Sequence, residues 1–305
     1  MLLSKSIEVD MKTDIWLIRN TSSLSGKTIG ITGSTGGLGR AICKYIAMLG
    51  GSLILLDRNA ALSSEHAREL EEKYKINVRT FKLDLEDIDN IAEVTDKLKN
   101  LKIDYLIHNA GAYSIPRRKC KSGYDNVFQI NFLSPYYMIR ELAPVFKITG
   151  GRFVIVGSIA HNYSKIDKND VDFSTRTASS KVYGNAKRWL MCASYSLIKE
   201  QGVDVSVTHP GISFTNITAH YPRLIFAVIK HPMKIIFMKP DKACLSVIRG
   251  IFDNTSFLEW IGPRMFDVWG SPSKKRLKTI SENEISYVGE RSENIYNDIK
   301  KDYNK

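Results

Sequence analysis

Short apolar runs alternate with longer segments of helical periodicity along the first two thirds of the chain. Six runs of strand length are followed by polar or glycine-containing turns: Thr28–Thr32, Leu53–Leu56, Val78–Leu83, Tyr105–Ile107, Phe153–Val156 and Val203–Val207. Between them apolar residues recur every three or four positions, which predicts amphipathic helices. These helices are expected at about 38–49, 65–74, 88–98, 124–146, with a kink at Pro135, and 179–200.

Strands that alternate with helices predict βαβ crossovers and a parallel sheet covered by helices on both faces. The strand runs are apolar throughout, as expected for strands buried on both sides. A run at Phe257–Ile261 predicts a seventh strand. We expect a doubly wound α/β domain over residues 27–270. It is preceded by an N-terminal extension, 1–26, and followed by a polar, partly disordered tail, 271–305.

The segment TGSTGGLG, Thr32–Gly39, contains four glycines between the first strand and the first helix. A loop at this position can hold a pyrophosphate over the free N–H groups of a helix N-terminus, and glycines let the backbone come close. The spacing is GxxxGxG. An acidic residue is expected about twenty residues later to bind the ribose hydroxyls. Asp57 follows Gly39 by eighteen residues and ends the second strand.

Four further motifs follow in order: NAG at 109–111, Ser158, YGNAK at 183–187 and PG at 210–211. With TGSTGGLG, they resemble the short-chain dehydrogenase/reductase family over about Lys27–Phe214. The interval between Ser158 and Tyr183 is similar to that of the retinol-dehydrogenase-like and protochlorophyllide-reductase-like branches. The resemblance implies a single Rossmann-like domain with a nicotinamide cofactor and a small-molecule substrate.

Tyr183 and Lys187 are four residues apart on a predicted helix and therefore share a face. A phenol of pKa near 10 becomes a better acid–base group when a cation lowers that pKa. Tyr183 is expected to carry the proton to and from the substrate oxygen, and Lys187 to lower its pKa and bind the nicotinamide ribose. Ser158 is expected to polarise a carbonyl. By resemblance, Asn131 would anchor a water that links Lys187 to solvent.

The expected cofactor-binding residues come from all five motifs and from the ends of the strands. They are Gly33, Ser34, Thr35, Gly37, Leu38, Gly39, Asp57, Arg58, Asp84, Leu85, Asn109, Ala110, Gly111, Tyr183, Lys187, Pro210, Gly211 and, by resemblance to PGxxxT, Thr215. Asp84 matches the family position near the adenine amino group, and it is also a candidate helix N-cap. His108 is assigned no chemistry.

NAD is the preferred cofactor and NADP the alternative. Asp57 would bind the adenine ribose hydroxyls and repel a 2′-phosphate. The adjacent Arg58 could instead clamp that phosphate.

The chain has 305 residues and a formal net charge of +12 at pH 7, but no block of like charges, which favours a solvated basic surface over nucleic-acid binding. Its four cysteines lie far apart and form no CxxC or Cys/His cluster, so no metal site is predicted. The first twenty residues do not resemble a signal peptide, and no apolar run approaches the ~20 residues that span a bilayer. A cytoplasmic location is the expectation.

The segment 212–240 is assigned as a substrate lid, and its part Leu224–Met238 is strongly apolar. It could close over an apolar substrate, pack against the sheet or a second subunit, or lie at a membrane surface; the last is the least favoured. A homo-oligomer stays open.

The sequence therefore predicts an NAD(P)-dependent oxidoreductase that acts on an alcohol or carbonyl group. Two alternatives remain: reduction of a carbon–carbon double bond, and a non-catalytic dinucleotide sensor.

Overall fold

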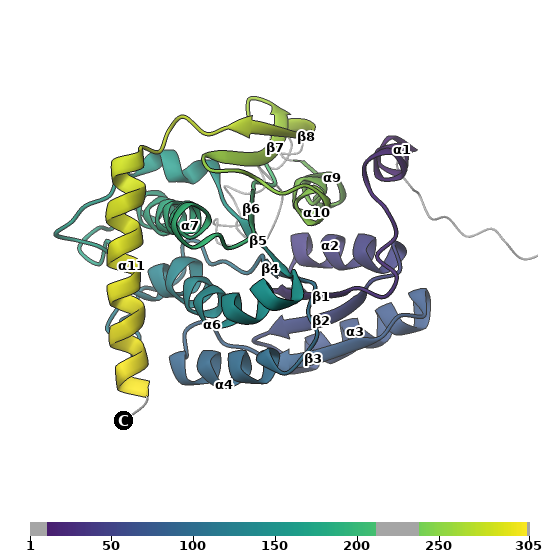
Figure 1. Ribbon diagram of the computed structural model, residues 1–305, viewed down its shortest axis with the longest axis horizontal. Helices are drawn as coiled ribbons and strands as arrows, with labels where there is room; N and C mark the ends of the chain where they lie inside the picture. The colour runs from purple at the N-terminus through teal and green to yellow at the C-terminus, as the bar shows by residue number, and fades with distance from the viewer. Residues whose placement is uncertain (1–10, 212–237, 304–305) are drawn as a thin grey trace, which may run out of the picture.

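An eight-stranded sheet forms the centre of the protein (Figure 1). The computed structural model describes residues 11–211 and 238–303. The strands lie in the order β3-β2-β1-β4-β5-β6-β7-β8. Their bounds are β1 (Thr28–Thr32), β2 (Ser52–Asp57), β3 (Val78–Lys82), β4 (Tyr105–His108), β5 (Arg152–Val156), β6 (Val205–Thr208), β7 (Glu259–Met265) and β8 (Trp269–Arg276). The seven expected parallel strands are all present, and β8 adds an antiparallel eighth.

Helices cover both faces of the sheet, as the alternating pattern predicts (Figure 1). The layer with α4, α6, α7 and α11 encloses one apolar core, and the layer with α2, α3 and α10 encloses the other. The helical bounds are α1 (Met11–Asn20), α2 (Gly37–Met48), α3 (Ala60–Tyr74), α4 (Ile88–Lys99), α5 (Asn126–Phe128), the π-helix η1 (Gln129–Leu133), α6 (Ser134–Thr149), the 3₁₀-helix η2 (Ile159–Tyr163), α7 (Ser179–Gln201), α9 (Pro240–Ala243), α10 (Leu245–Phe252) and α11 (Glu282–Tyr303).

The continuous apolar character of β2 follows from this two-sided burial. Leu53 and Leu55 face the core beneath α2 and α3, whereas Ile54 and Leu56 face the core beneath α4 and α6. Successive side chains of a strand point to opposite faces, so the interior positions of a strand that is covered on both sides are apolar.

The long helix expected over 124–146 is divided into three parts. A short α5 leads into the π-helical turn Gln129–Leu133, and α6 begins only at Ser134. Pro135 lies in the first turn of α6, where proline is tolerated, so the change of helical register comes before it. The π-helical turn contains Asn131, and such turns are frequent at functional sites.

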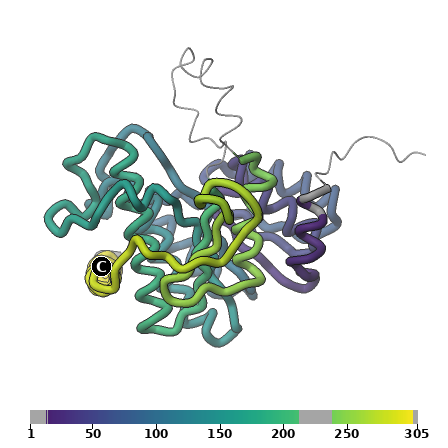
Figure 2. The backbone as a smooth tube through the Cα atoms, turned by 90° about the horizontal axis from the view of Figure 1, so that it is seen from above, coloured from purple at the N-terminus to yellow at the C-terminus, as the bar shows by residue number. Residues whose placement is uncertain are grey.

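The C-terminal region is not the partly disordered tail that its polar composition suggests. Residues 269–276 form β8 along the edge of β7, and residues 282–303 form the 22-residue helix α11. Ser281 and Glu284 make a reciprocal capping box at its start: Ser281 Oγ accepts from Glu284 N, and Glu284 Oε2 accepts from Ser281 N. Helix α11 packs across the outer side of α7 in Figure 1, and Figure 2 shows α11 end-on at the periphery of the molecule.

The extension before the sheet contains α1, which packs through Leu17 onto the core beneath α2. Residues 212–237 lie outside the described residues, and with them most of the expected lid and Thr215. Among the described residues, none of the helices combines the length and apolar character needed to cross a membrane.

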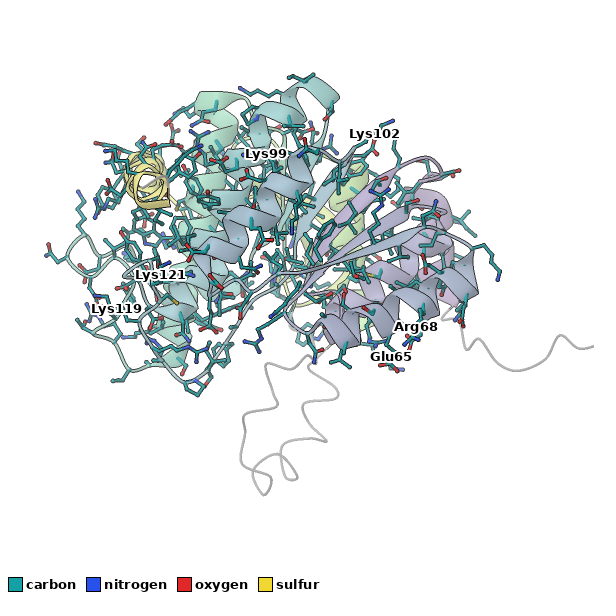
Figure 3. The ribbon with its side chains drawn as sticks, turned by 90° about the horizontal axis from the view of Figure 1, so that it is seen from below. Glu65, Arg68, Lys99, Lys102, Lys119 and Lys121 are labelled. Atoms are coloured by element: carbon teal, nitrogen blue, oxygen red, sulfur yellow. The ribbon has the colours of Figure 1, made fainter. Side chains whose placement is uncertain are left out.

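In the described part of the chain, basic side chains lie on separate regions of the surface. In Figure 3, Lys99 and Lys102 lie well apart from Lys119 and Lys121. Lys99 pairs with Glu141 and Lys121 with Asp89.

Helix α11 approaches α7 so closely that a side chain at Gly289 has no room. A Cβ there would lie 2.1 Å from Ser196 Oγ and 2.7 Å from Ser196 Cβ. We expect Gly289→Ala to lower the free energy of unfolding by about 1–3 kcal/mol, because overpacking outweighs the gain in helix propensity. Urea denaturation measures this. Ser286→Ala, on the exposed face of the same helix, should change stability by less than about 0.5 kcal/mol. A Gly289→Ala protein as stable as the parent would contradict the packing.

Candidate active site

A cleft of about 480 Å³ opens at the carboxyl ends of the parallel strands. This is the edge where doubly wound sheets bind ligands. Most of the residues predicted from the sequence line it: Gly33, Thr35, Gly37, Leu38, Gly39, Asp57, Arg58, Asp84, Leu85, Asn109, Ala110, Gly111, Ser158, Tyr183, Lys187, Pro210 and Gly211. Ser34 and Asn131 lie buried behind this wall, and Thr215 lies outside the described residues.

The glycine loop brings bare backbone to the floor of the cleft. Gly33 has a φ of +71°, and a Cβ at Gly39 would lie 2.1 Å from Gly33 O, so neither position tolerates a side chain. Helix α2 begins at Gly37, and its N-cap Gly36 provides no side-chain acceptor. The first-turn amides of α2 are therefore free to bind an anion such as a pyrophosphate.

Asp57 at the end of β2 is only 3% exposed and is surrounded by donors from the protein itself. Its carboxylate accepts from Ser34 Oγ at 2.5 Å, from Ser63 Oγ at 2.9 Å and from the amide and hydroxyl of Thr35 at 3.2 Å. The carboxylate thus fixes the glycine loop from below. A ribose that binds at Asp57 has to share this carboxylate with Ser34 and Thr35.

The ends of β3 and β4 complete the nucleotide side of the cleft. Asn109 Nδ2 donates to Thr32 O and Gly33 O, both at 3.0 Å, and so ties β4 to the glycine loop. Asp84 accepts from Glu86 N at 3.0 Å within its own turn. The N-cap of α4 is Asp87 rather than Asp84, because Asp87 accepts from the first-turn amides of that helix.

The catalytic candidates meet at the opposite end of the cleft. Lys187 Nζ donates to Val156 O at 2.9 Å and lies 5.7 Å from the centre of the Tyr183 ring. The Ser158 side chain lies beside the phenol of Tyr183 at this end of the cleft. Neighbouring turns of α7 and the end of β5 thus bring Tyr183, Lys187 and Ser158 together.

Asn131 is held behind Lys187 by the π-helical turn. Its amide donates to Ala112 O and Val127 O, both at 2.8 Å, and its Oδ1 accepts from Ala112 N at 3.2 Å. A Cβ at Gly111 would meet Asn131 Oδ1 at 2.7 Å and Lys187 Nζ at 3.6 Å. Asn131 Oδ1 and Lys187 Nζ thus both lie close to Gly111, and the water that the resemblance implies between Lys187 and solvent stays a prediction.

Burial dominates the electrostatics of this end of the cleft. It lowers the pKa of Lys187 to about 8 and raises the pKa of Tyr183 to about 12, while the neighbouring Ser158 hydroxyl acts to lower the pKa of Tyr183. The expected lowering of the Tyr183 pKa by Lys187 does not occur in the protein alone.

Several site residues escaped the sequence analysis. Tyr113, two residues beyond NAG, contacts the Tyr183 ring edge-on with centres 5.4 Å apart. His209 lines the cleft beside Pro210 and stacks on Trp260. Tyr113 could have been found from the sequence, because it is an aromatic residue directly after the NAG turn. His209 could not, because its stacking on Trp260 joins residues from distant strands and no local pattern reveals it.

His108, left without a role, is buried and stacks on Phe153. Burial and, secondarily, the charge of Lys187 lower its pKa to about 3, so it is neutral. Within the described ranges 11–211 and 238–303, His, Cys, Asp and Glu side chains form no cluster of three or more that could hold a metal ion.

Comparison with known proteins agrees with this geometry. The family model for short chain dehydrogenases matches residues 27–223. The chain belongs to the short-chain dehydrogenase family. This confirms the family and the fold predicted from the motifs.

Curated relatives of this short-chain dehydrogenase include three human proteins. Human WW domain-containing oxidoreductase is 28% identical over 68% of this chain and 54% of its own length. Human retinol dehydrogenase 13 is 27% identical over 65% and 62%, and human polyprenol dehydrogenase is 27% identical over 72% and 70%. The chain thus spans 54% and 62% of the first two relatives.

Solved structures share the fold. An uncharacterised protein from Mycobacterium paratuberculosis aligns with a TM-score of 0.72 and 21% identity over 92% of this chain and 96% of its own. A short-chain dehydrogenase from Sphingobium yanoikuyae in complex with NADPH aligns with a TM-score of 0.57 and 21% identity over 74% and 84%.

The buried ammonium of Lys187 should reduce stability. Its pKa in the folded protein, about 8, lies below its ordinary value of 10.5, so the folded state binds fewer protons between these values and the penalty is greatest below pH 8. We expect Lys187→Met to raise the free energy of unfolding at pH 7 by about 1–3 kcal/mol. The gain should shrink as the pH rises from 8 towards 10.5. Urea denaturation at pH 7 and pH 9.5 measures both effects, and a gain independent of pH would contradict the assignment.

Proposed function

We propose that this short-chain dehydrogenase transfers a hydride between a nicotinamide dinucleotide, NAD or NADP, and an alcohol or carbonyl compound. The observation that carries the proposal is the convergence of the Tyr183 phenol, the Ser158 hydroxyl and the Lys187 ammonium at one end of a cleft. The uncapped amides of α2 lie at the same cleft.

The cleft fits a dinucleotide in two respects. The first-turn amides of α2 and the bare backbone of the glycine loop suit a pyrophosphate. An ammonium has three N–H donors, and among the described residues only Val156 O accepts from Lys187. The remaining donors would hold the nicotinamide ribose.

The residues of the chain supply the proton chemistry. When bound, the nicotinamide supplies or accepts the hydride. Ser158 donates to the substrate oxygen and holds it beside the phenol. Tyr183 donates a proton to this oxygen during carbonyl reduction and removes it during alcohol oxidation. Lys187 holds an ammonium close to the phenol, and an oxidised nicotinamide, when bound, would add a second positive charge; positive charge near a phenol favours its phenolate form.

An apolar substrate is the second part of the proposal. Tyr113 and Ile115 line the cleft on the side of Tyr183, and the former touches the phenol ring. Two relatives are named for retinol and polyprenol, which are apolar alcohols. Two alternative functions remain to be tested. One is reduction of a carbon–carbon double bond, and the other is dinucleotide sensing without turnover.

NAD is the proposed preference. The Asp57 carboxylate lies at the adenosine end of the cleft, where its charge disfavours a 2′-phosphate. Arg58, the residue that could clamp that phosphate, lies 3.7 Å from Glu86, which also binds Arg118 at 2.6 Å. Recruiting Arg58 to a phosphate would therefore compete with an existing ion pair.

We also propose that the protein is cytoplasmic and that it forms a homo-oligomer. The four cysteines are free, which suits a reducing compartment. Sedimentation of the purified protein and fractionation of cells that express it test the two points separately.

Tyr183→Phe is the decisive test of turnover. Loss of the hydroxyl should lower kcat by about 100-fold or more, while dinucleotide affinity is retained. The assay is a panel of apolar and small alcohols, ketones and enones with either cofactor, followed by the absorbance of the reduced nicotinamide. Tyr163→Phe, which changes an exposed tyrosine, serves as the control. Selective reduction of enones would favour the first alternative, and dinucleotide binding without turnover in the parent protein would favour the sensor.

Asp57→Asn tests the cofactor preference. The amide keeps the shape of the side chain and can still bond to Ser34 and Ser63, but it removes the charge. We expect the ratio of kcat/KM for NAD to that for NADP to fall by about tenfold, equivalent to ~1.4 kcal/mol. Arg58→Ala should leave this ratio unchanged. If instead Arg58→Ala weakens NADP use and Asp57→Asn has no effect, the preference is set by the arginine and our assignment is wrong.

A further inference from the structure

A chain of hydrogen bonds leads from Ser158 away from the cleft to the C-terminal segment. Ser158 caps the 3₁₀-helix η2: its Oγ accepts from Ala160 N at 3.1 Å, and its carbonyl accepts from His161 N at 3.1 Å. The Ser158 carbonyl also lies 2.6 Å from His161 Nδ1. The position of the serine thus depends directly on His161.

The partners of His161 determine its tautomer. A carbonyl oxygen only accepts, so Nδ1 carries the proton and donates to Ser158 O. Burial lowers the pKa of His161, which keeps the ring neutral and leaves Nε2 as an acceptor. Thr279 Oγ1, 2.6 Å from Nε2, is then the donor. Thr279 lies 118 residues away along the chain, in the segment that leads into α11.

A second connection joins the same segment to α7. Arg188 follows Lys187 directly, and it is 4% exposed. Its guanidinium donates to His161 O at 3.1 Å and to Thr279 O at 2.7 Å. It also makes a two-pronged ion pair with Glu284, at 2.9 and 2.8 Å, the same carboxylate that caps α11.

The aromatic ring of Trp260 completes this arrangement. It meets His161 edge-on at 5.7 Å and stacks on His209 at 5.1 Å, with ring planes 11° apart. His209 Nε2 donates to Asp267 O at 2.9 Å in the turn between β7 and β8. His209 immediately precedes Pro210 of the cleft wall. Residues after position 259 therefore contact the segments that follow both β5 and β6.

We propose that His161 is a positioning residue for the hydride-transfer reaction, and that Thr279 fixes it from the C-terminal segment. The proposal rests on the proposed function, since its effect is exerted through Ser158. Without the Thr279 hydroxyl, Nε2 of His161 loses its donor, and the ring then holds the Ser158 carbonyl less firmly, so the Ser158 hydroxyl is less well positioned relative to Tyr183. The nucleotide end of the cleft, formed by β1 and β2, makes none of these contacts.

The position of Thr279 makes this inference testable without disturbing the core. Thr279 is exposed, so Thr279→Val removes a hydroxyl and leaves no cavity. We expect kcat to fall by about tenfold or more while dinucleotide affinity stays unchanged, because small displacements of catalytic groups are costly for rate. Thr279→Ser should restore kcat. His161→Phe, which keeps an aromatic edge against Trp260 and removes both side-chain hydrogen bonds, should reproduce the loss.

Hydrogen–deuterium exchange provides a readout that needs no substrate. The amides of residues 158–163 should exchange faster in Thr279→Val than in the parent protein. Thr149→Val is the matched control, because Thr149 is exposed like Thr279, its hydroxyl donates to Val145 O within α6, and it does not line the cleft. Its kcat and its exchange at 158–163 should be unchanged.

The outcomes separate this proposal from the proposed function. Unchanged exchange at 158–163 in Thr279→Val overturns the role of His161, whether or not the parent protein turns over a substrate. Unchanged kcat in an active protein overturns it as well, as does an equal loss of kcat and dinucleotide affinity, which indicates general loss of the fold. If the parent protein is inactive across the panel, the proposed function fails, and the role in catalysis fails with it. Faster exchange would then establish only the structural link between Thr279 and Ser158.

Discussion

The buried ammonium of Lys187 is the constraint around which the catalytic end of the protein is organised. The residue is 2% exposed, and this burial lowers the pKa of its ammonium. A cation in this position is tolerated because a carbonyl at the end of β5 accepts from it and Asn131 is fixed close by. The π-helical turn that holds Asn131 and the bare backbone at Gly111 both lie against this ammonium.

The other end of the cleft holds a buried negative charge, the carboxylate of Asp57, which has several hydrogen-bond partners within the protein. Asp57 is equally buried, but Ser34, Thr35 and Ser63 surround its carboxylate with donors. A fully bonded carboxylate fixes a loop, whereas an ammonium with donors to spare is ready to bind a ligand. At the nucleotide end, donors from the protein already bond to the carboxylate of Asp57. At the end where chemistry would take place, the ammonium of Lys187 still has N–H groups that can donate to a ligand.

The sequence predicted the parts of the fold that depend on local pattern. The two-sided burial of β2 and the glycine loop before α2 follow from apolar periodicity and glycine spacing alone. The π-helical turn at Gln129–Leu133 could not be predicted, because its extra residue is accommodated by packing against α7. Helix α11 was missed although Ser281 and Glu284 have the capping-box spacing, since the preceding lysines and arginine indicated a solvated tail.

Site residues divide in the same way. Tyr183 and Lys187 are visible in the sequence because one helix carries both. The donors to Asp57 were only partly visible: Ser34 and Thr35 belong to the glycine motif, but Ser63 reaches the carboxylate from the first turn of α3. The partnership of His161 with Thr279 spans more than a hundred residues and depends on how α11 docks, which no local pattern encodes.

The antiparallel strand β8 has a consequence for the sheet as a whole. It covers the edge of β7, so among the described strands the sheet ends at β3 on one side and β8 on the other. Both outer strands display cations: Arg79 and Lys82 on β3, Lys274 and Arg276 on β8. Unpaired strand edges are templates for intermolecular pairing, and charged side chains along them oppose it. Two molecules that met edge to edge would bring like charges together, so the sheet is protected against runaway polymerisation at both of its margins.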